Sequence, residues 1–139
     1  LFGFNPKVAF VSHSTFGQPL TQRTKHIQDA VEILKKKNVN FEFDGDMQPD
    51  VALNKEYQSL YPFSKIVGNA NILIMPGQHS AAISYKLMKS LGDTKVIGPL
   101  LIGLGLPIEI VPLRSSTSEI INLASIAAYS ADIIEYKKN

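Results

Sequence analysis

Cysteine is absent from this chain of 139 residues, so disulfide bonds and thiolate metal sites are excluded. The chain also has no apolar run near the ~20 residues that a membrane-spanning helix needs. Its opening segment lacks the charged region of a signal peptide. We therefore expect a cytoplasmic protein without a membrane partner. Because the chain begins with Leu1 rather than methionine, we also expect it to be a fragment of a longer protein.

Neither sign of charge dominates, since 14 basic and 12 acidic residues leave a net charge of +2. The one basic run, residues 35–37, ends a helical pattern, where cations interact favourably with the helix dipole. Aromatic residues do not alternate with the lysines, as they would on a face that binds nucleic acid. We therefore expect no nucleic-acid partner. An apolar share of 45% is typical of one globular domain, which we assign to residues 1–139.

Short apolar runs and helical patterns alternate along the chain. The pattern predicts helices at residues 22–37, around residues 83–91 with an end at Gly92, and from Ser116 onward, where Ser116 and Glu119 have the spacing of a capping box. Such alternation predicts an α/β fold, a three-layer α/β/α arrangement with a mostly parallel sheet and with ligands beyond the carboxyl ends of the strands. The predicted strands are residues 7–11, 41–43, 72–75, 100–104 and 108–111.

The last predicted helix carries apolar residues on more than one face. A first set, expected to be its buried face, consists of Ile120, Leu123, Ala124 and Ala127. Further apolar positions lie outside that set, at Ile121, Ala128 and Ile134. A helix that is apolar on two faces is commonly buried on both, so we expect a homo-oligomer, at least a dimer.

The loop after the first predicted strand, residues 12–19, is rich in hydroxyl groups. Ser12, Ser14 and Thr15 lie here together with Gly17, and such a loop can offer hydroxyl and N–H donors to an anion. Hydroxyl-rich loops also occur without any ligand. The loop has neither the Walker spacing nor a GxGxxG motif, so those classes of nucleotide site are not supported.

The three histidines do not have the spacing of a metal site. His26 lies in the first predicted helix, where we expect it at the surface. His13 and His79 each follow the end of a predicted strand, so they could meet in a cleft, although most such histidines have no catalytic or ligand role.

A group of carboxylates at Asp44, Asp46 and Asp50 allows two interpretations. Carboxylate oxygens are the ligands that Mg²⁺ prefers, but Asp and Gly are equally typical of a turn and of the start of a short helix. We favour the turn, and we therefore predict no metal site.

Several segments in order resemble the phosphotransacetylase and phosphotransbutyrylase family. Residues 44–53 read DGDMQPDVAL, where that family carries DGE-[LM]-Q-x-D-x-A-L. Residues 7–15 (KVAFVSHST), 69–76 (NANILIMP), 97–103 (IGPLLIG) and 122–124 (NLA) are similar to further family segments. The resemblance covers essentially the whole chain, and it implies that the chain is one lobe of a two-lobe phosphotransacetylase-like module.

The chain departs from the family at the positions that carry its chemistry. Active transacetylases usually read S-R-G-[CS]-S before the last helix, where the Ser and Arg are catalytic and phosphate-binding. When the motif is matched without gaps, those two positions fall here on Pro112 and Leu113, and Arg114 stands where the family has Gly. The family's N-A-G-N is likewise replaced by residues 79–82, HSAA.

These losses are similar to those in the carboxy-terminal part of large bacterial NADP-dependent malic enzymes. The resemblance implies an amino-terminal malic enzyme domain that uses NADP and a divalent metal, an upstream transacetylase-like lobe, and a tail without catalytic residues or a cofactor of its own. That tail would sense acetyl-CoA or another acyl-CoA and assist oligomerisation. The effector-binding residues expected on this basis are Ser12, Ser14, Thr15, Arg114, Ser115 and Glu119. The alternative is that the chain is part of an active phosphate acetyltransferase. A third possibility is that it is a purely structural dimerisation lobe.

Overall fold

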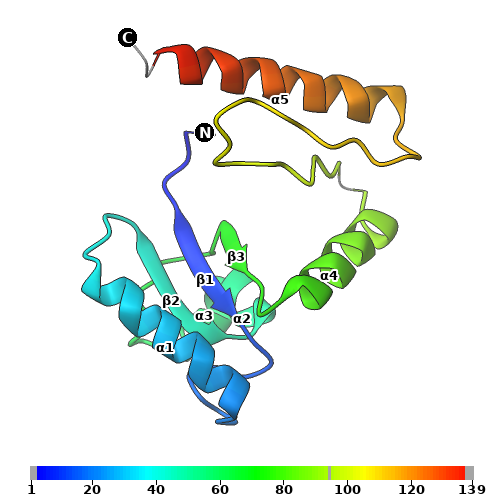
Figure 1. The fold of residues 1–139 in the computed structure, drawn as a ribbon. Coiled ribbons are helices and arrows are strands. Elements are labelled where there is room, and N and C mark those ends of the chain that lie inside the picture. The colour runs from blue at the N-terminus through cyan, green and yellow to red at the C-terminus, as the bar shows by residue number, and fades with distance from the viewer. Residues whose placement is uncertain (1–2, 94, 137–139) are drawn as a thin grey trace. The chain divides into compact units, whose positions relative to one another are not determined.

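The structure, a computed structural model, describes residues 3–93 and 95–136, without the side chains of residues 134–136. It divides into two compact units, Leu1–Lys86 and Leu87–Asn139. The elements, drawn in Figure 1, are β1 (Lys7–Val11), α1 (Gln22–Lys36), β2 (Glu42–Met47), α2 (Pro49–Leu53), α3 (Lys55–Gln58), β3 (Ile72–Ile74), α4 (Gln78–Leu91) and α5 (Thr117–Tyr136).

The first unit is built on a parallel sheet with the strand order β2-β1-β3. Val8 of β1 lies opposite Phe43 on one side and Ile72 on the other. The register with β2 shifts between Phe10 and Val11. The predicted α/β class and the parallel sheet are confirmed.

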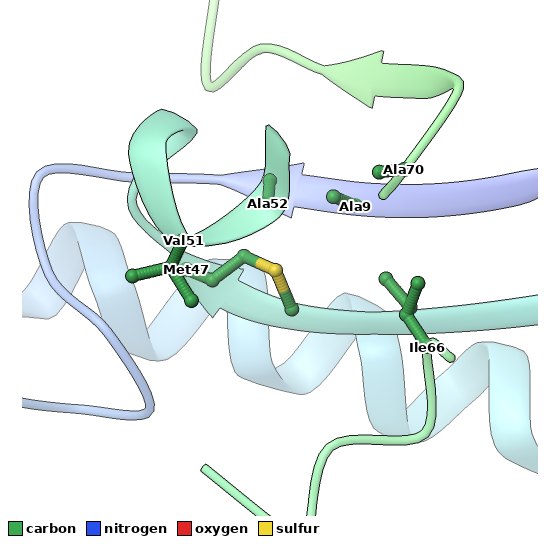
Figure 2. Packing of buried hydrophobic residues seen from close by; sticks show 6 residues of the cluster. All are labelled: Ala9, Met47, Val51, Ala52, Ile66 and Ala70. Carbon is green, nitrogen blue, oxygen red and sulfur yellow. The ribbon is translucent and has the colours of Figure 1, made fainter. Parts of the chain in front are cut away.

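Helices cover both faces of this sheet, because successive side chains of a strand point to opposite faces. Val8 and Phe43 pack against Val31 of α1 on one face. Ala9 faces the other side, where it joins a cluster with Met47 and Ile66 (Figure 2). That cluster also contains Val51 and Ala52 of α2 and Ala70. Figure 1 shows α1 in front of the sheet and α2 and α3 behind it, so the first unit has three layers.

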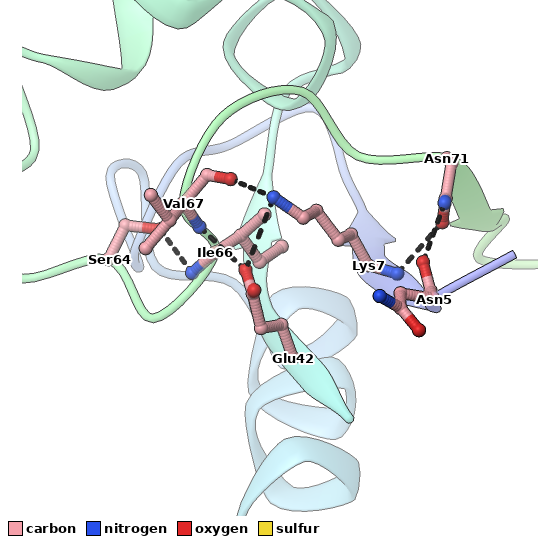
Figure 3. Close-up of polar contacts among 7 residues, drawn as sticks. All are labelled: Asn5, Lys7, Glu42, Ser64, Ile66, Val67 and Asn71. Carbon is pink, nitrogen blue, oxygen red and sulfur yellow. Dashed lines mark hydrogen bonds and ion pairs between the residues drawn. The ribbon is translucent and has the colours of Figure 1, made fainter. Parts of the chain in front are cut away.

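Polar contacts fix the start of β1 to the segment that precedes β3 (Figure 3). The Lys7 N–H donates to Asn71 Oδ1 at 2.8 Å, and Asn71 Nδ2 donates to the Asn5 carbonyl at 2.8 Å. Glu42 accepts from the Val67 N–H at 2.8 Å and pairs with the Lys7 ammonium at 3.8 Å. These contacts hold the amino-terminal edge of the sheet, the edge opposite to the one at which ligands are expected.

Two of the five predicted strands are wrong. Residues 100–104 and 108–111 are not assigned to any strand. A strand is stabilised by ladder hydrogen bonds to a neighbouring strand, whereas the Leu101 N–H donates to the side chain of Glu109 at 3.2 Å. The apolar composition of this segment predicted strands, but the segment does not pair with a neighbouring strand.

The predicted turn at Asp44 and Asp46 is also wrong, because both residues belong to β2. Asp44 Oδ2 accepts from the Lys65 N–H at 2.8 Å, and Asp44 Oδ1 accepts from the Gly45 N–H at 3.0 Å. Both carboxylates are buried. Asp and Gly are rare in strands, and here the buried hydrogen bonds outweigh that preference. The short helix does follow, with Pro49 in its first turn.

The apolar helices of the carboxy-terminal half are less covered than their sequence predicted. Ile83, Leu87 and Leu91 of α4 are all exposed, and so are Ile120 and Ala124 of the expected buried face of α5. Leu123 is buried. Of the outer positions of α5, Ile121 and Ala128 are exposed, and the side chain of Ile134 lies outside the described residues.

The predicted capping box at the start of α5 is confirmed. The Glu119 N–H donates to Ser116 Oγ at 3.3 Å, and Glu119 Oε2 accepts from the Ser116 N–H at 2.7 Å. Among the described residues, no helix combines the length and the apolar character that crossing a membrane requires.

Candidate functional site

The hydroxyl-rich loop, residues 12–19, lies at the carboxyl end of β1, as the sequence predicted. Its hydroxyl groups, however, do not face open solvent, because Ser12, Ser14 and Thr15 are all buried. The Ser14 N–H donates to Ser12 Oγ at 3.3 Å, and the two hydroxyl oxygens lie 3.4 Å apart. The loop therefore folds back onto its own side chains.

Asp46 of β2 is the residue that holds this loop in place. Its carboxylate is fully buried and accepts three hydrogen bonds. Ser14 Oγ donates to Oδ2, while the Gly17 N–H and Gln28 Nε2 donate to Oδ1 at 3.1 and 3.0 Å. A buried carboxylate is tolerated only when donors replace its water shell. Asp46 thus connects the loop, β2 and α1 through one group.

A second set of contacts joins the loop to the residues that follow β2. Thr15 Oγ1 accepts from the Gln48 N–H at 3.2 Å, and Gln48 Nε2 donates to the His13 carbonyl at 2.9 Å. The Ser12 N–H donates to the Met47 carbonyl at 2.9 Å. The hydroxyls of Ser14 and Thr15, two of the predicted effector-binding groups, thus already have partners within the protein.

Gly17 allows the chain to make this approach. Its φ is +81°, which residues with a side chain rarely adopt, and a Cβ at this position would lie 2.8 Å from Gln28 Nε2. A larger residue would displace the Gln28 amide from Asp46.

Next to the loop, a cleft of about 900 Å³ opens at the carboxyl ends of β1 and β3. His13 and His79 both line it, so the prediction that they could meet in a cleft is confirmed. His26 is exposed, as predicted, and lines the same cleft together with Arg23. The sequence pattern of α1 alone did not indicate this contribution to the cleft. Ser12 is the one predicted effector-binding residue that lines the cleft.

The other predicted site residues, Arg114, Ser115 and Glu119, belong to the second unit. Arg114 is exposed in the segment before α5, next to the fully exposed Leu113. The Ser115 N–H donates to the Pro112 carbonyl at 3.0 Å. The six predicted residues thus form two groups, one in each unit.

The carboxylate of Glu119 already has partners. A hydrogen bond from the Lys89 ammonium, followed by the two hydrogen bonds from Ser116, lowers the pKa of Glu119 to about 2. Glu119 therefore stays ionised near neutral pH, where it stabilises the start of α5. Across the described residues, no group of three His, Asp or Glu side chains is placed to hold a metal ion.

Comparison with known proteins relates the chain to one family of acyltransferases. Residues 1–128 match the family described as phosphate acetyl/butaryl transferase. An NADP-dependent malic enzyme of Rhizobium meliloti is 46% identical over 129 residues, which are 93% of this chain and 17% of that enzyme. A phosphate acetyltransferase of Clostridium acetobutylicum is 35% identical over 132 residues, 94% of this chain and 40% of that enzyme.

The solved structure of EutD phosphotransacetylase from Staphylococcus aureus superposes with a TM-score of 0.84 at 31% identity. The match covers 94% of this chain and 41% of that structure. The chain thus spans about a sixth of the malic enzyme and about two fifths of the two transferases.

Proposed function

The chain belongs to the phosphate acetyl/butaryl transferase family, and we propose that it is a non-catalytic, acetyl-CoA-sensing and oligomerisation region of an NADP-dependent malic enzyme. The parent enzyme would convert malate to pyruvate by oxidative decarboxylation, with NADP and a divalent metal bound elsewhere in the protein. The similarity to the Rhizobium meliloti malic enzyme supports this proposal, since identity is 46% for that enzyme against 35% for the Clostridium acetobutylicum transferase.

The observation that carries the proposal is the pair Pro112 and Leu113, at the positions where the family motif has Ser and Arg. Acyl transfer to phosphate requires positioned donors for the negative charge that develops on oxygen, and removal of one such donor typically costs about 10² to 10³ in rate. Proline and leucine side chains have no donor. The Leu113 side chain is fully exposed and contributes no polar contact.

The sensing role is supported by what the chain retains. The hydroxyl loop is rigidly held by Asp46, and Ser12 lines a cleft of about 900 Å³, within the usual size of small-molecule sites. Arg114, next to the altered pair, is exposed and can meet a phosphate group with its guanidinium. Loss of transition-state donors removes turnover without removing ground-state binding, so a chain that lacks these donors can still bind a substrate as an effector.

A second candidate function is part of an active phosphate acetyltransferase. The observation that favours it is the match to the Staphylococcus aureus phosphotransacetylase, with a TM-score of 0.84. In that case Arg114 would have to take over the role of the missing arginine.

One preparation of the full-length protein distinguishes the two candidates. We expect NADP-dependent malate decarboxylation that responds to acetyl-CoA, and no transfer of acetyl from acetyl-CoA to phosphate above the rate without enzyme. An acetyl-transfer turnover of ~1 s⁻¹, which lies in the normal range for enzymes, would contradict the non-catalytic assignment.

The role of Arg114 has its own test. Because charge-assisted hydrogen bonds contribute about 1.5–3 kcal/mol, Arg114→Ala should weaken acetyl-CoA binding by roughly 10- to 100-fold. Lys86→Ala is a suitable control, since Lys86 is also an exposed cation but lies on α4, outside the altered segment at Pro112 and Leu113. Equal affinity of Arg114→Ala and the wild type would exclude Arg114 from the effector site.

A further inference from the structure

A second pocket, of about 340 Å³, lies in the first unit and shares no lining residue with the cleft described above. Its walls come from α1, from β2, from the segment that precedes β3, and from Phe16 of the hydroxyl-rich loop. Small-molecule sites usually measure about 300–1,000 Å³. This pocket therefore suits a ligand of amino-acid size better than one of nucleotide size.

The Asp44 carboxylate lines this pocket and is buried without a cationic partner. It accepts from the Gly45 N–H at 3.0 Å and from the Lys65 N–H at 2.8 Å. Within residues 3–93 and 95–136, no ammonium, guanidinium or imidazole group pairs with it. A buried charge is costly unless an opposite charge is paired with it, and an ionised carboxylate has about four acceptor positions. Asp44 can therefore accept further hydrogen bonds from a cationic group.

Two further acceptors from α1 line the same pocket. Gln28 Nε2 donates to Asp46 at 3.0 Å, while Gln28 Oε1 accepts no hydrogen bond in the described part of the chain. The Asp29 carboxylate forms an exposed pair with Lys25 at 3.4 Å, which leaves most of its acceptor positions open. An ammonium group has three N–H donors and no acceptor. The pocket thus offers enough acceptors to replace the water around one ammonium group.

The pocket also contains a cation that has no partner, the Lys65 ammonium. Lys35, the other lysine of the lining, pairs with Glu32 at 2.5 Å. A hydrogen bond from Lys35, together with the field of Lys35, Lys65 and Lys36, lowers the pKa of Glu32. The Lys65 ammonium itself forms no hydrogen bond or ion pair within residues 3–93 and 95–136. It is therefore available to a carboxylate of a ligand.

Two aromatic rings give the pocket an apolar wall. The ring centroids of Phe16 and Phe63 lie 4.8 Å apart with an angle of 67° between the ring planes. Phe63 is 64% exposed, so its ring is open to contact from the pocket. Cover of an exposed ring by an apolar group is favourable because it removes apolar surface from water.

We propose that this pocket binds a free amino acid with an apolar or aromatic side chain. Its ammonium group is recognised by Asp44 and Gln28 Oε1, its carboxylate by Lys65, and its side chain by the rings of Phe16 and Phe63. A simple anion would meet the carboxylates of the lining, and an amine without a carboxylate would leave Lys65 without a partner. The inference does not rest on the proposed function, because it uses neither the cleft nor the Pro112 segment.

The first experiment screens the common amino acids one by one against the full-length protein, without acetyl-CoA or malate. A ligand that binds the folded protein raises its Tm, and we expect an apolar or aromatic amino acid to do so. Calorimetry then compares the amino acid with the largest Tm shift with two analogues, the amine that lacks its carboxylate and the acid that lacks its ammonium group. Each analogue should bind about 10- to 100-fold more weakly, since each loses a set of charge-assisted hydrogen bonds.

Variants then locate the binding site. Lys65→Met and Lys55→Met each remove one exposed ammonium group, but only Lys65 lines the pocket. We expect Lys65→Met to raise the Kd of the same amino acid by about 10- to 100-fold, and Lys55→Met to leave it unchanged. Phe63→Ala should also raise the Kd, because it removes the exposed ring.

Three results would overturn the inference. The first is that no amino acid raises the Tm, and the second is that the amine or the acid binds as tightly as the amino acid. The third is that Lys65→Met and Phe63→Ala bind the amino acid as well as the wild type does, which would place the binding elsewhere in the protein. Circular dichroism of each variant confirms that a weaker Kd does not come from unfolding.

Discussion

Removal of the Asp46 carboxylate should destabilise the first unit more than removal of any exposed carboxylate. Asp46→Ala leaves the Ser14 hydroxyl, the Gly17 N–H and one N–H of Gln28 without an acceptor. Ser14 and Gly17 are buried, and a buried donor without a partner costs about 1–3 kcal/mol. Gln28 is only partly buried and can turn to water. The two buried donors together give an expected loss of about 2–6 kcal/mol.

Asp46→Asn should cost much less, because the asparagine keeps the shape and one acceptor oxygen. Its carbonyl can still accept from Gly17 and Gln28, and its NH₂ can donate to Ser14 Oγ, since a hydroxyl both donates and accepts. We expect a loss of about 1 kcal/mol, the difference between a charge-assisted and a neutral hydrogen bond.

Urea unfolding of the chain, followed by circular dichroism, measures these differences. With a slope of about 2 kcal/mol/M, a loss of 2–6 kcal/mol lowers the unfolding midpoint by about 1–3 M. The control is Asp29→Ala, which removes an exposed carboxylate that forms an i,i+4 pair with Lys25, typically a contribution of about 0.3–0.5 kcal/mol. If Asp46→Ala and Asp29→Ala have the same midpoint, the reasoning about the Asp46 network is refuted.

Three further predictions concern the backbone, the pH response and assembly. Gly45→Ala should destabilise the chain by about 1–3 kcal/mol, because φ of Gly45 is +155° and the new Cβ would lie 2.7 Å from the Phe10 Cβ and carbonyl oxygen. Gly105→Ala is the control: a Cβ at Gly105 would have no neighbouring atom within 4 Å, so this change should be nearly neutral in the same unfolding assay. The pKa of Glu119 is lowered from 4.5 to about 2, so the ionised carboxylate should stabilise the fold fully above pH ~5 and lose this effect as pH falls toward 2. The difference in unfolding free energy between wild type and Glu119→Gln should therefore disappear by pH ~2. Since Ile121 and other apolar residues of α5 are exposed, sedimentation of the chain at tens of micromolar should show a dimer or larger species, and a monomer would contradict the assembly prediction.

The sequence predicted the elements whose signals are local. The apolar run of β1 and the periodic stripe of α1 were placed to within one residue, and the capping box of Ser116 and Glu119 formed as expected. These signals depend on a strand covered on both faces and on a helix with one buried face, and neither needs knowledge of distant residues.

Elements that depend on distant partners were not predictable in the same way. Asp44 and Asp46 have the composition of a turn, but hydrogen bonds from Lys65 and from the hydroxyl loop hold them in a strand. Conversely, residues 100–111 are apolar enough for strands, yet no strand pairs with them in the described chain. Local composition cannot show which distant backbone or side-chain groups become available.

The candidate site was predicted in part for the same reason. His13 and His79 follow strand ends, and parallel strands bring those ends to one edge, so their meeting followed from the order of the elements. Arg23 and His26 are polar residues on an amphipathic helix, where the usual expectation is a solvated face. Only the packing of α1 beside the strand ends shows that these two residues line the cleft.

The most direct test of an acetyl-CoA sensor is reciprocal binding of malate and acetyl-CoA to the full-length protein. Calorimetric titration of acetyl-CoA, with and without saturating malate, measures the coupling between the two sites. Allosteric coupling of ~1–3 kcal/mol predicts that malate changes the acetyl-CoA Kd by about 5- to 150-fold, and that acetyl-CoA changes the malate Kd by the same factor. An acetyl-CoA Kd that is identical with and without malate, or no acetyl-CoA binding at all, would contradict the account.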